Sequence, residues 1–152
     1  MTDVHDRQTR SRNMAAIKSR NTKPELLVRK ELHRRGLRYS LRNKLLPGRP
    51  DLVLTKYRVA VFVHGCFWHK HNCRYFKLPQ TNTQFWFNKI TLNTERDDEV
   101  IQQIMSLGYR VLVIWECAFK GANKEKLDAA LRNAIEWVKS KDSNLNLLII
   151  PN

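Results

Sequence analysis

The sequence lacks several features that would place it in a common class of protein. Its three cysteines in 152 residues are odd in number, which argues against a disulfide framework and favours free thiols or metal ligands in a reducing cytosol. No apolar run approaches the roughly 20 residues that a membrane span needs, and the polar, basic N-terminus does not resemble a secretory signal. Internal repeats, low-complexity tracts and clear linkers are also missing. We therefore expect one cytoplasmic domain with a substantial core.

Acidic residues are scarce as well. The chain contains 14 Asp and Glu residues and 28 Lys and Arg residues, which gives a formal net charge of +14. Residues 1–50 carry 14 basic against 4 acidic side chains, whereas residues 51–152 carry 14 against 10. A concentrated positive surface attracts a polyanion, and nucleic acid is the first candidate. The alternative is a solvated basic face that only maintains solubility, which does not require so large an imbalance. A membrane-surface helix is disfavoured because no strong apolar face opposes the basic residues.

We divide the chain into a basic N-terminal DNA-binding arm, residues 1–22, and a single domain, residues 23–152. The arm contains few apolar residues, and it is expected either to order on a phosphate backbone or to remain a flexible tail. Met14 in this arm could enter between bases, as apolar side chains do in groove-binding proteins, or it could pack loosely on the domain.

The pattern of apolar residues predicts a mixed α/β domain. A helix is expected from a cap at Thr22 to a stop at Gly36, with an apolar face that includes Leu26 and Leu27. The other expected elements are a strand-like segment at 37–41, a hairpin of strands at 51–54 and 58–63, a helix at 82–107, a central strand at 109–115, a helix at 123–139 and a last strand at 145–150.

A segment rich in His and Cys follows the hairpin. Residues 64–73 contain three of the five histidines and two of the three cysteines. Thiolate and imidazole are the ligands of structural zinc, and the end of the central strand delivers the third thiol. Spacing alone leaves open whether His69 or His71 is the nitrogen ligand. The alternative is that the loop thiols are incidental and Cys117 is a buried apolar residue. The set that uses every cysteine is Cys66, His71, Cys73 and Cys117.

Asp51 stands at the mouth of the hairpin, directly after a turn that contains two prolines. A carboxylate held rigidly there is suited to Mg²⁺, although Pro-Asp alone is a weak signal. Phosphodiester cleavage needs an activated water, charge neutralisation at phosphorus and a proton for the leaving oxygen, and His64 and His69 could supply proton transfer and phosphate contact. The usual nuclease hairpin carries an acid-x-Lys triplet shortly after the Asp, where residues 61–63 read Val-Phe-Val. Either the protein is a zinc-stabilised DNA-binding module without catalysis, or the histidines replace the missing groups.

Several segments match the motifs of one known family. The most specific reads His-Gly-Cys-Phe-Trp-His at 64–69, and others lie at 3–6, 11–14, 46–51, 71, 73, 85–86, 95–97 and 115–117. The chain thus resembles the very short patch repair (Vsr) family of DNA mismatch endonucleases over nearly its whole length. The resemblance implies a restriction-endonuclease-like α/β fold, a mixed central sheet flanked by helices with a structural zinc site. It also implies nicking on the 5′ side of the T in a T:G mismatch, which arises when 5-methylcytosine deaminates.

The resemblance also implies roles for individual residues. Asp51 and the backbone carbonyl of Val63, where the family pattern has Thr, would hold Mg²⁺, with two ions expected. Glu25 would reach the metal through water, although a simple helix-start role is the alternative. His64 and His69 would be catalytic, with His69 the general base. The zinc ligands fall on the set named above. The DNA-contacting residues would be Met14 in one groove and an aromatic wedge of Phe67, Trp68 and Trp86 in the other.

A T:G wobble pair stacks less well than a Watson–Crick pair, so opening it costs less, and stacking on aromatic side chains returns energy. Lys89 and Asn93, one helical turn apart near Trp86, could read base edges. The expected partner is duplex DNA with a T:G mismatch, and mismatch-repair proteins could be others. We expect a monomer without membrane contact in the bacterial cytoplasm, acting at the nucleoid. A third interpretation, an ordinary restriction or recombination nuclease, predicts cleavage of fully paired DNA and usually a dimer.

Overall fold

A computed structural model describes residues 22–41, 43–120, 123–140 and 145–151, so Met14 and most of the basic arm lie outside the described residues. Four strands form one mixed sheet in the order β1-β2-β3-β4. β1 is antiparallel to β2, whereas β2 with β3 and β3 with β4 are parallel. The strands are β1 (Leu52–Leu54), β2 (Val59–His64), β3 (Arg110–Trp115) and β4 (Leu147–Ile150).

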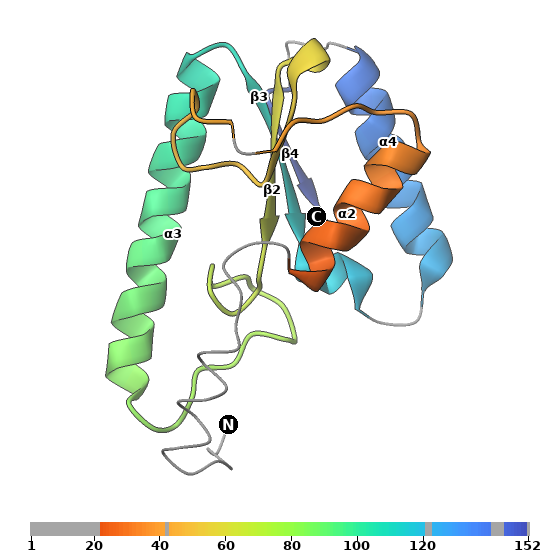
Figure 1. Cartoon of the computed structure of the whole chain (residues 1–152). Helices are drawn as coiled ribbons and strands as arrows, with labels where there is room; N and C mark the ends of the chain where they lie inside the picture. The colour runs from red at the N-terminus through yellow and green to blue at the C-terminus, as the bar shows by residue number, and fades with distance from the viewer. Residues whose placement is uncertain (1–21, 42, 121–122, 141–144, 152) are drawn as a thin grey trace.

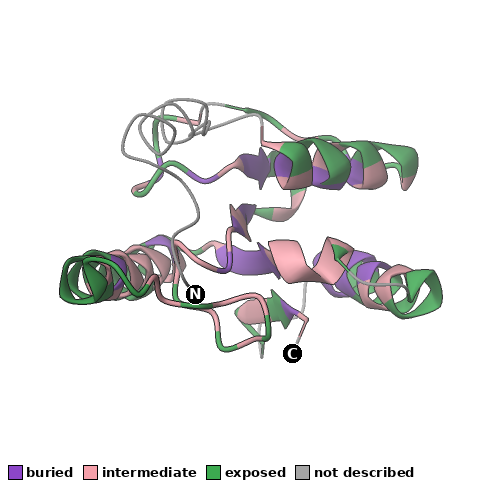
Figure 2. Cartoon of the chain, turned by 90° about the horizontal axis from the view of Figure 1, so that it is seen from below, coloured by how far each residue is buried: buried purple, intermediate pink, exposed green. Residues whose placement is uncertain are grey.

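Helices cover both faces of this sheet and make three layers (Figure 1). α3 (Thr83–Ser106) lies on one face, and α2 (Lys23–Arg34) and α4 (Lys124–Ser140) lie on the other. Figure 2 shows that the strands are largely buried between the helices. Two apolar cores result, because successive side chains of a strand point to opposite faces. Val53, Phe62 and Val111 pack with Ile104 on the α3 side, and Leu52, Val61 and Leu112 pack with Val28 and Val138 on the other. The mixed α/β fold expected from the sequence is confirmed.

The parallel pairing of β2 with β3 positions the functional residues. His64 pairs with Trp115 at the carboxyl ends of the two strands, so the residues that follow each strand emerge at the same edge of the sheet. The His/Cys-rich segment follows β2, and a short 3₁₀ helix, Glu116–Phe119, follows β3. Both strands are buried on both faces, as their continuous apolar runs predict. The carboxyl edge of such strands is where open α/β sheets bind ligands.

The buried face of α2 differs from the expectation. Leu26 is 50% exposed and Leu27 is 36% exposed, so these two leucines do not face the sheet. A helix turns once in about 3.6 residues, and positions three or four apart therefore share a face. The side of α2 that packs on the sheet consists of Glu25, Val28 and Leu32. One of the three buried positions is thus a carboxylate.

The expected strand at 37–41 does not form. In this segment only Ser40 makes a strand-like contact, a single antiparallel bridge to Val53 in which the Ser40 N–H donates to the Val53 carbonyl at 2.8 Å. β1 itself pairs fully with β2 but is three residues long, so it offers too short an outer edge for another strand. The hairpin of β1 and β2 is confirmed, with a 3₁₀ turn (Thr55–Tyr57) and a left-handed Arg58 between its strands.

α3 begins and ends close to the predicted positions. Thr83 Oγ1 donates a hydrogen bond to the Pro79 carbonyl at 2.7 Å at the start of the helix. Ile90 and Ile104 are buried against the sheet, while the first turns extend past the sheet beside the loop that follows β2 (Figure 1). Phe85 and Phe87 on these turns are 58% and 40% exposed. None of the described helices is long and apolar enough to cross a membrane.

Candidate active site and metal centre

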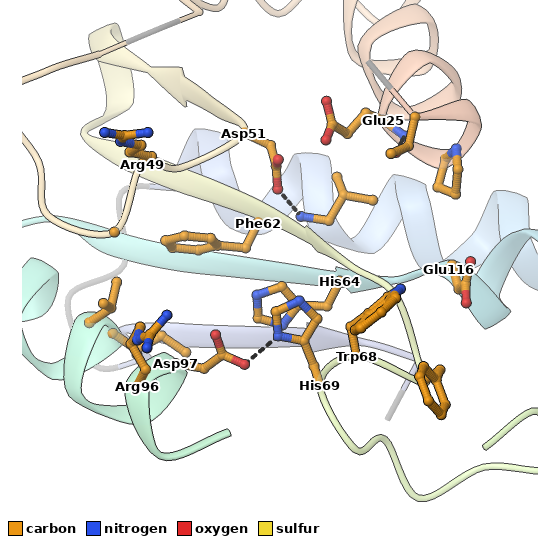
Figure 3. A pocket seen from close by; sticks show the side chains of 18 residues that line it. Glu25, Arg49, Asp51, Phe62, His64, Trp68, His69, Arg96, Asp97 and Glu116 are labelled. Atoms are coloured by element: carbon orange, nitrogen blue, oxygen red, sulfur yellow. Dashed lines mark hydrogen bonds and ion pairs between the residues drawn. The ribbon is translucent and has the colours of Figure 1, made fainter. Parts of the chain in front are cut away.

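A cleft of about 600 Å³ opens beside the carboxyl end of β2. Its walls come from α2, the β1–β2 hairpin, the loop after β2 and α3. Figure 3 shows carboxylate and imidazole side chains from these parts around one space. The sequence-predicted residues that line it are Glu25, Asp51, Val63, His64, Phe67, Trp68 and His69.

Asp51 is held by the backbone of the neighbouring strand. Its carboxylate accepts a hydrogen bond from the Val63 N–H at 2.6 Å. The pKa of Asp51 is raised to about 7, chiefly by burial and in part by the nearby Glu25 side chain, against the opposing effect of the Val63 N–H. Glu25 is 4% exposed and forms an ion pair with Arg29 at 3.2 Å. Two carboxylates crowded in a buried cleft are oxygen donors suited to a hard divalent cation, which would stabilise their charged forms.

The two histidines of the cleft lie face to face. Their rings are stacked, with centroids 3.9 Å apart and an interplanar angle of 9°. The pKa of His64 is lowered to about 3, chiefly by burial and also by the neighbouring His69, so His64 is neutral near pH 7. Nδ1 of His64 is buried and has no hydrogen-bond partner among the described residues. Nδ1 of His69 contacts the carboxylate of Asp97 on α3, which leaves Nε2 of His69 free to accept a proton.

A second cluster lies where the loop after β2 meets the end of β3. The ligand atoms of its four residues all lie within 4.8 Å of one another, close enough to share one ion. The spacing left open whether His69 or His71 is the nitrogen ligand. His71 lies in this cluster, whereas His69 lies in the cleft. Three sulfurs and one nitrogen form a soft donor set of the kind that binds zinc. The cluster consists of Cys66, His71, Cys73 and Cys117.

Contacts with the loop backbone and with β3 help to position His71 within this cluster. The His71 N–H donates to the Cys66 carbonyl at 2.9 Å, and the His71 ring stacks on Trp115 at 4.0 Å. Burial raises the pKa of the Cys66 and Cys117 thiols. Such thiols stay protonated at neutral pH unless a cation displaces the proton. The donor set and its geometry therefore fit a bound metal ion.

Three aromatic rings form a blade next to the cleft. The ring centroids of Phe67, Trp68 and Trp86 lie 5.1 to 5.8 Å apart, and all three side chains are half-buried. Nζ of Lys89 lies 5.9 Å from the centroid of Trp68 and 5.8 Å from that of Trp86. Nδ2 of Asn93 donates to the Trp68 carbonyl at 3.2 Å. α3 thus holds the loop that carries Trp68, and one amide hydrogen of Asn93 is used in this hydrogen bond.

Comparison with known proteins identifies the family. A family model described as "DNA mismatch endonuclease Vsr" matches residues 2–75. The DNA mismatch endonuclease Vsr of Escherichia coli (strain K12) is 46% identical over 138 residues, which cover 91% of this chain and 88% of that protein. The chain belongs to the Vsr family of DNA mismatch endonucleases.

Two further relatives of this Vsr-family protein are named as type II nicking enzymes. V.NmeAIP of Neisseria meningitidis is 44% identical over 134 residues, which cover 87% of this chain and 96% of the relative. V.XorIIP of Xanthomonas oryzae pv. oryzae is 40% identical over 136 residues, which cover 90% and 98%. The match extends over nearly the full length of each, so this chain is a DNA endonuclease of the Vsr family.

Reasoning from sequence missed two acids of the Vsr-family cleft. Asp97 contacts His69 across 28 residues of chain. The family match at 95–97 includes it, but no role was assigned to it. Glu116 lines the cleft and accepts a hydrogen bond from the Cys66 N–H at 3.1 Å. Glu116 therefore ties the loop after β2 to the end of β3, next to the cysteine cluster.

Replacing Asp97 by Asn should slow DNA cleavage by this Vsr-family enzyme by about a hundredfold, within the range for loss of general acid–base catalysis. The Asn side chain cannot offer the His69 Nδ1–H a charged acceptor, so the imidazole is no longer held in its orientation. Single-turnover rates at saturating DNA give the measurement, with DNA affinity expected to stay within threefold. Glu95→Gln, which removes an exposed charge from the same part of α3, is the control. Equal rates for both variants would remove Asp97 from the catalytic machinery.

Proposed function

We propose that this protein nicks duplex DNA on the 5′ side of the T in a T:G mismatch, in a Mg²⁺-dependent reaction that starts repair of deaminated 5-methylcytosine. The observation that carries the proposal is the juxtaposition of Asp51, His64 and His69 in one cleft. The blade of three aromatic rings stands beside this cleft. Hydrolytic groups and an apolar wedge so close together suit an enzyme that opens a base pair and cuts next to it.

The residues of the cleft divide the work of hydrolysis. His69 takes the proton of the attacking water at Nε2, and Asp97 holds its ring through Nδ1. His64, which lines the cleft and is neutral near pH 7, contacts the phosphate. Asp51 and the Val63 carbonyl would hold the metal, and Glu25 would reach it through water. Two Mg²⁺ ions held there would supply charge neutralisation at phosphorus and would stabilise the leaving oxygen.

The missing acid-x-Lys triplet is compatible with this division. Val61 and Phe62 are buried in the two cores, so these positions of β2 have apolar packing roles. The catalytic groups follow instead at the end of the strand, at His64, and in the next loop, at His69. The competing interpretation, a zinc-stabilised DNA-binding module without catalysis, gives no use to an imidazole oriented by a carboxylate.

Mismatch selection follows from the cost of unstacking. Opening one base step costs a few kcal/mol, and stacking on an aromatic ring returns about 1–3 kcal/mol per base. A T:G wobble pair stacks poorly and costs less to open, so the stacking energy favours insertion of Phe67, Trp68 and Trp86 at this pair. Lys89, beside the blade, is placed to read a base edge, and Asn93 can do so with its remaining hydrogen-bonding groups. Met14, outside the described residues, is expected to enter from the opposite groove.

Zn²⁺ is the proposed ion of the cysteine cluster, where it would fasten the loop after β2 to the end of β3. Replacing Cys117 by Ser should remove bound zinc and lower the melting temperature by about 10 °C, because metal-binding energy contributes directly to folding. Metal analysis and thermal unfolding measure the two effects. A zinc chelator should lower the melting temperature of the wild type but leave the variant unchanged. Normal zinc content in Cys117→Ser would contradict the assignment.

The proposed function is tested with labelled duplexes that contain T:G or T:A at one position, each with Mg²⁺ or with EDTA. The expected result is a nick in the T:G duplex with Mg²⁺ and none in the other three reactions. Efficient cutting of T:A would favour an ordinary restriction nuclease, and mismatch binding without any cut would favour the non-catalytic module. We further propose that the enzyme acts as a monomer in the bacterial cytoplasm, where mismatch-repair proteins are candidate partners.

A further inference from the structure

Two arginines of the cleft have no role in the mechanism above. Arg49 and Arg96 are the only Lys or Arg side chains among the described residues that line it. A DNA strand brings one negative charge per phosphate into a cleft that is already rich in acids, so positive charge is needed where the strand passes. The acids of the lining are Glu25, Asp51, Asp97 and Glu116.

The fold makes no evident use of either guanidinium. Both side chains are exposed, and within the described ranges neither forms a hydrogen bond, an ion pair or a ring contact. Other arginines of the protein are paired: Arg29 with Glu25, Arg35 with Asp128, and Arg132 also with Asp128. Two partnerless guanidiniums at the mouth of an acidic cleft are available to an anionic ligand.

The backbone brings the two arginines together. A Cβ at Gly48 would lie 2.2 Å from Cγ1 of Val100, so the turn before Arg49 is pressed against α3. Val100 is one helical turn after Arg96, and the two therefore share a face of α3. Arg49 itself has a φ of 50°, a left-handed conformation that non-glycine residues rarely adopt, and the buried Pro50 follows it. The turn and this face of α3 therefore place Arg49 and Arg96 at the same end of the cleft.

The position of the pair in the cleft indicates which phosphate it meets. Figure 3 shows Arg49 and Arg96 at one end of the cleft, on either side of Phe62, and Trp68 towards the other end. Asp51 and the stacked histidines lie between. On the proposed function, the mismatched T at the blade is 3′ of the cut, so the strand that passes the catalytic groups continues in the 5′ direction towards the arginines.

We propose that Arg49 and Arg96 clamp the phosphate that lies immediately 5′ of the scissile one. The guanidinium forks hold this phosphate from the hairpin side and from the α3 side, and they set the register of the strand over Asp51. They are positioning residues and do not touch the reacting atoms. The direction of the strand rests on the proposed function, whereas the phosphate contact itself does not.

The first test measures DNA binding in EDTA, so that it is independent of nicking. Arg49→Gln and Arg96→Gln should each weaken binding to a T:G duplex about tenfold, the effect of losing one charge-assisted hydrogen bond. The slope of log affinity against log salt should become shallower by about 0.9 for each variant. Arg96→Lys should keep the slope, since it keeps the charge. Arg132→Gln, an exposed arginine on α4, is the control and should change neither quantity.

The second test locates the contact. A duplex with an uncharged methylphosphonate immediately 5′ of the cut loses the contacts of both arginines and should bind the wild type about a hundredfold more weakly, and Arg96→Gln should lose no further affinity on it. Additive losses, or slopes equal to that of the wild type, would overturn the clamp. So would a fall in the maximal nicking rate with normal affinity, because the arginine would then act on the scissile phosphate. Failure of the wild type to nick a T:G duplex would refute the proposed function, but the binding results would still test the phosphate contact.

Discussion

Replacing Asp51 by Asn should reduce the rate of T:G nicking by about a thousandfold while leaving mismatch affinity within threefold of the wild type. Loss of a metal-holding carboxylate removes several kcal/mol of transition-state stabilisation, and each 1.36 kcal/mol corresponds to a factor of about ten in rate. Asn keeps an oxygen that can accept the hydrogen bond from the Val63 N–H, so the hairpin should stay intact. Single-turnover kinetics in Mg²⁺ and binding in EDTA separate the two quantities.

The variant should fold normally. Burial raises the pKa of Asp51 to about 7, which means that its charge is disfavoured in the folded protein, and removing the charge should not lower the melting temperature. Asp98→Asn on α3, an exposed acid, serves as the matched control and should nick at the wild-type rate. Full activity of Asp51→Asn would refute its role as a metal ligand.

Replacing Trp68 by Ala should lower the preference for T:G over T:A by about tenfold. Stacking of a base on an aromatic ring contributes about 1–3 kcal/mol, and this energy is recovered only where the pair opens easily. The substitution keeps the Trp68 carbonyl that accepts from Asn93, so the loop should remain attached to α3. The measurement is the ratio of dissociation constants for the two duplexes.

Phe87→Ala is the control for the blade. Phe87 is an exposed aromatic residue of α3 whose ring contacts Lys70, and it has no ring contact with Phe67, Trp68 or Trp86 in the described structure. Its replacement should leave the T:G preference unchanged. An unchanged ratio in Trp68→Ala as well would exclude this residue from the wedge.

The sheet could be predicted because the signal for its central strands is local. β2 and β3 are continuous apolar runs, and a strand buried on both faces needs such a run. The hairpin turn and the limits of α3 were also readable from residues that favour turns and helix ends. The parallel pairing of β2 with β3 depends on contacts across about 50 residues of chain, and no local pattern specifies it.

The errors have a shared physical cause. At α2 the two exposed leucines were placed on the apolar face because hydrophobicity was taken as the guide, whereas the buried face includes the carboxylate of Glu25. At 37–41 the alternation of side chains was taken as a strand, although a strand forms only when a neighbouring edge can pair with it. Both depend on tertiary contacts.

The two clusters differ in how far the sequence revealed them. Cys66, His71 and Cys73 lie within eight residues of one another, so their composition alone suggested a metal site. Asp97 reaches His69 only because α3 packs along the sheet, so the family match at 95–97 marked the acid without revealing its partner. The metal roles of Asp51 and of the Val63 carbonyl remain predictions, and Asp51→Asn tests the first of them.

We infer that the same cleft cuts the DNA strand whose base pair Phe67, Trp68 and Trp86 have opened. The most direct test is to map the cut in a T:G duplex labelled on each strand in turn, with Mg²⁺ present. We expect a single break in the T-containing strand, at the phosphate on the 5′ side of the T, and an intact G-containing strand. Breaks in both strands, or a break at a site that does not move when the mismatch is moved, would contradict it.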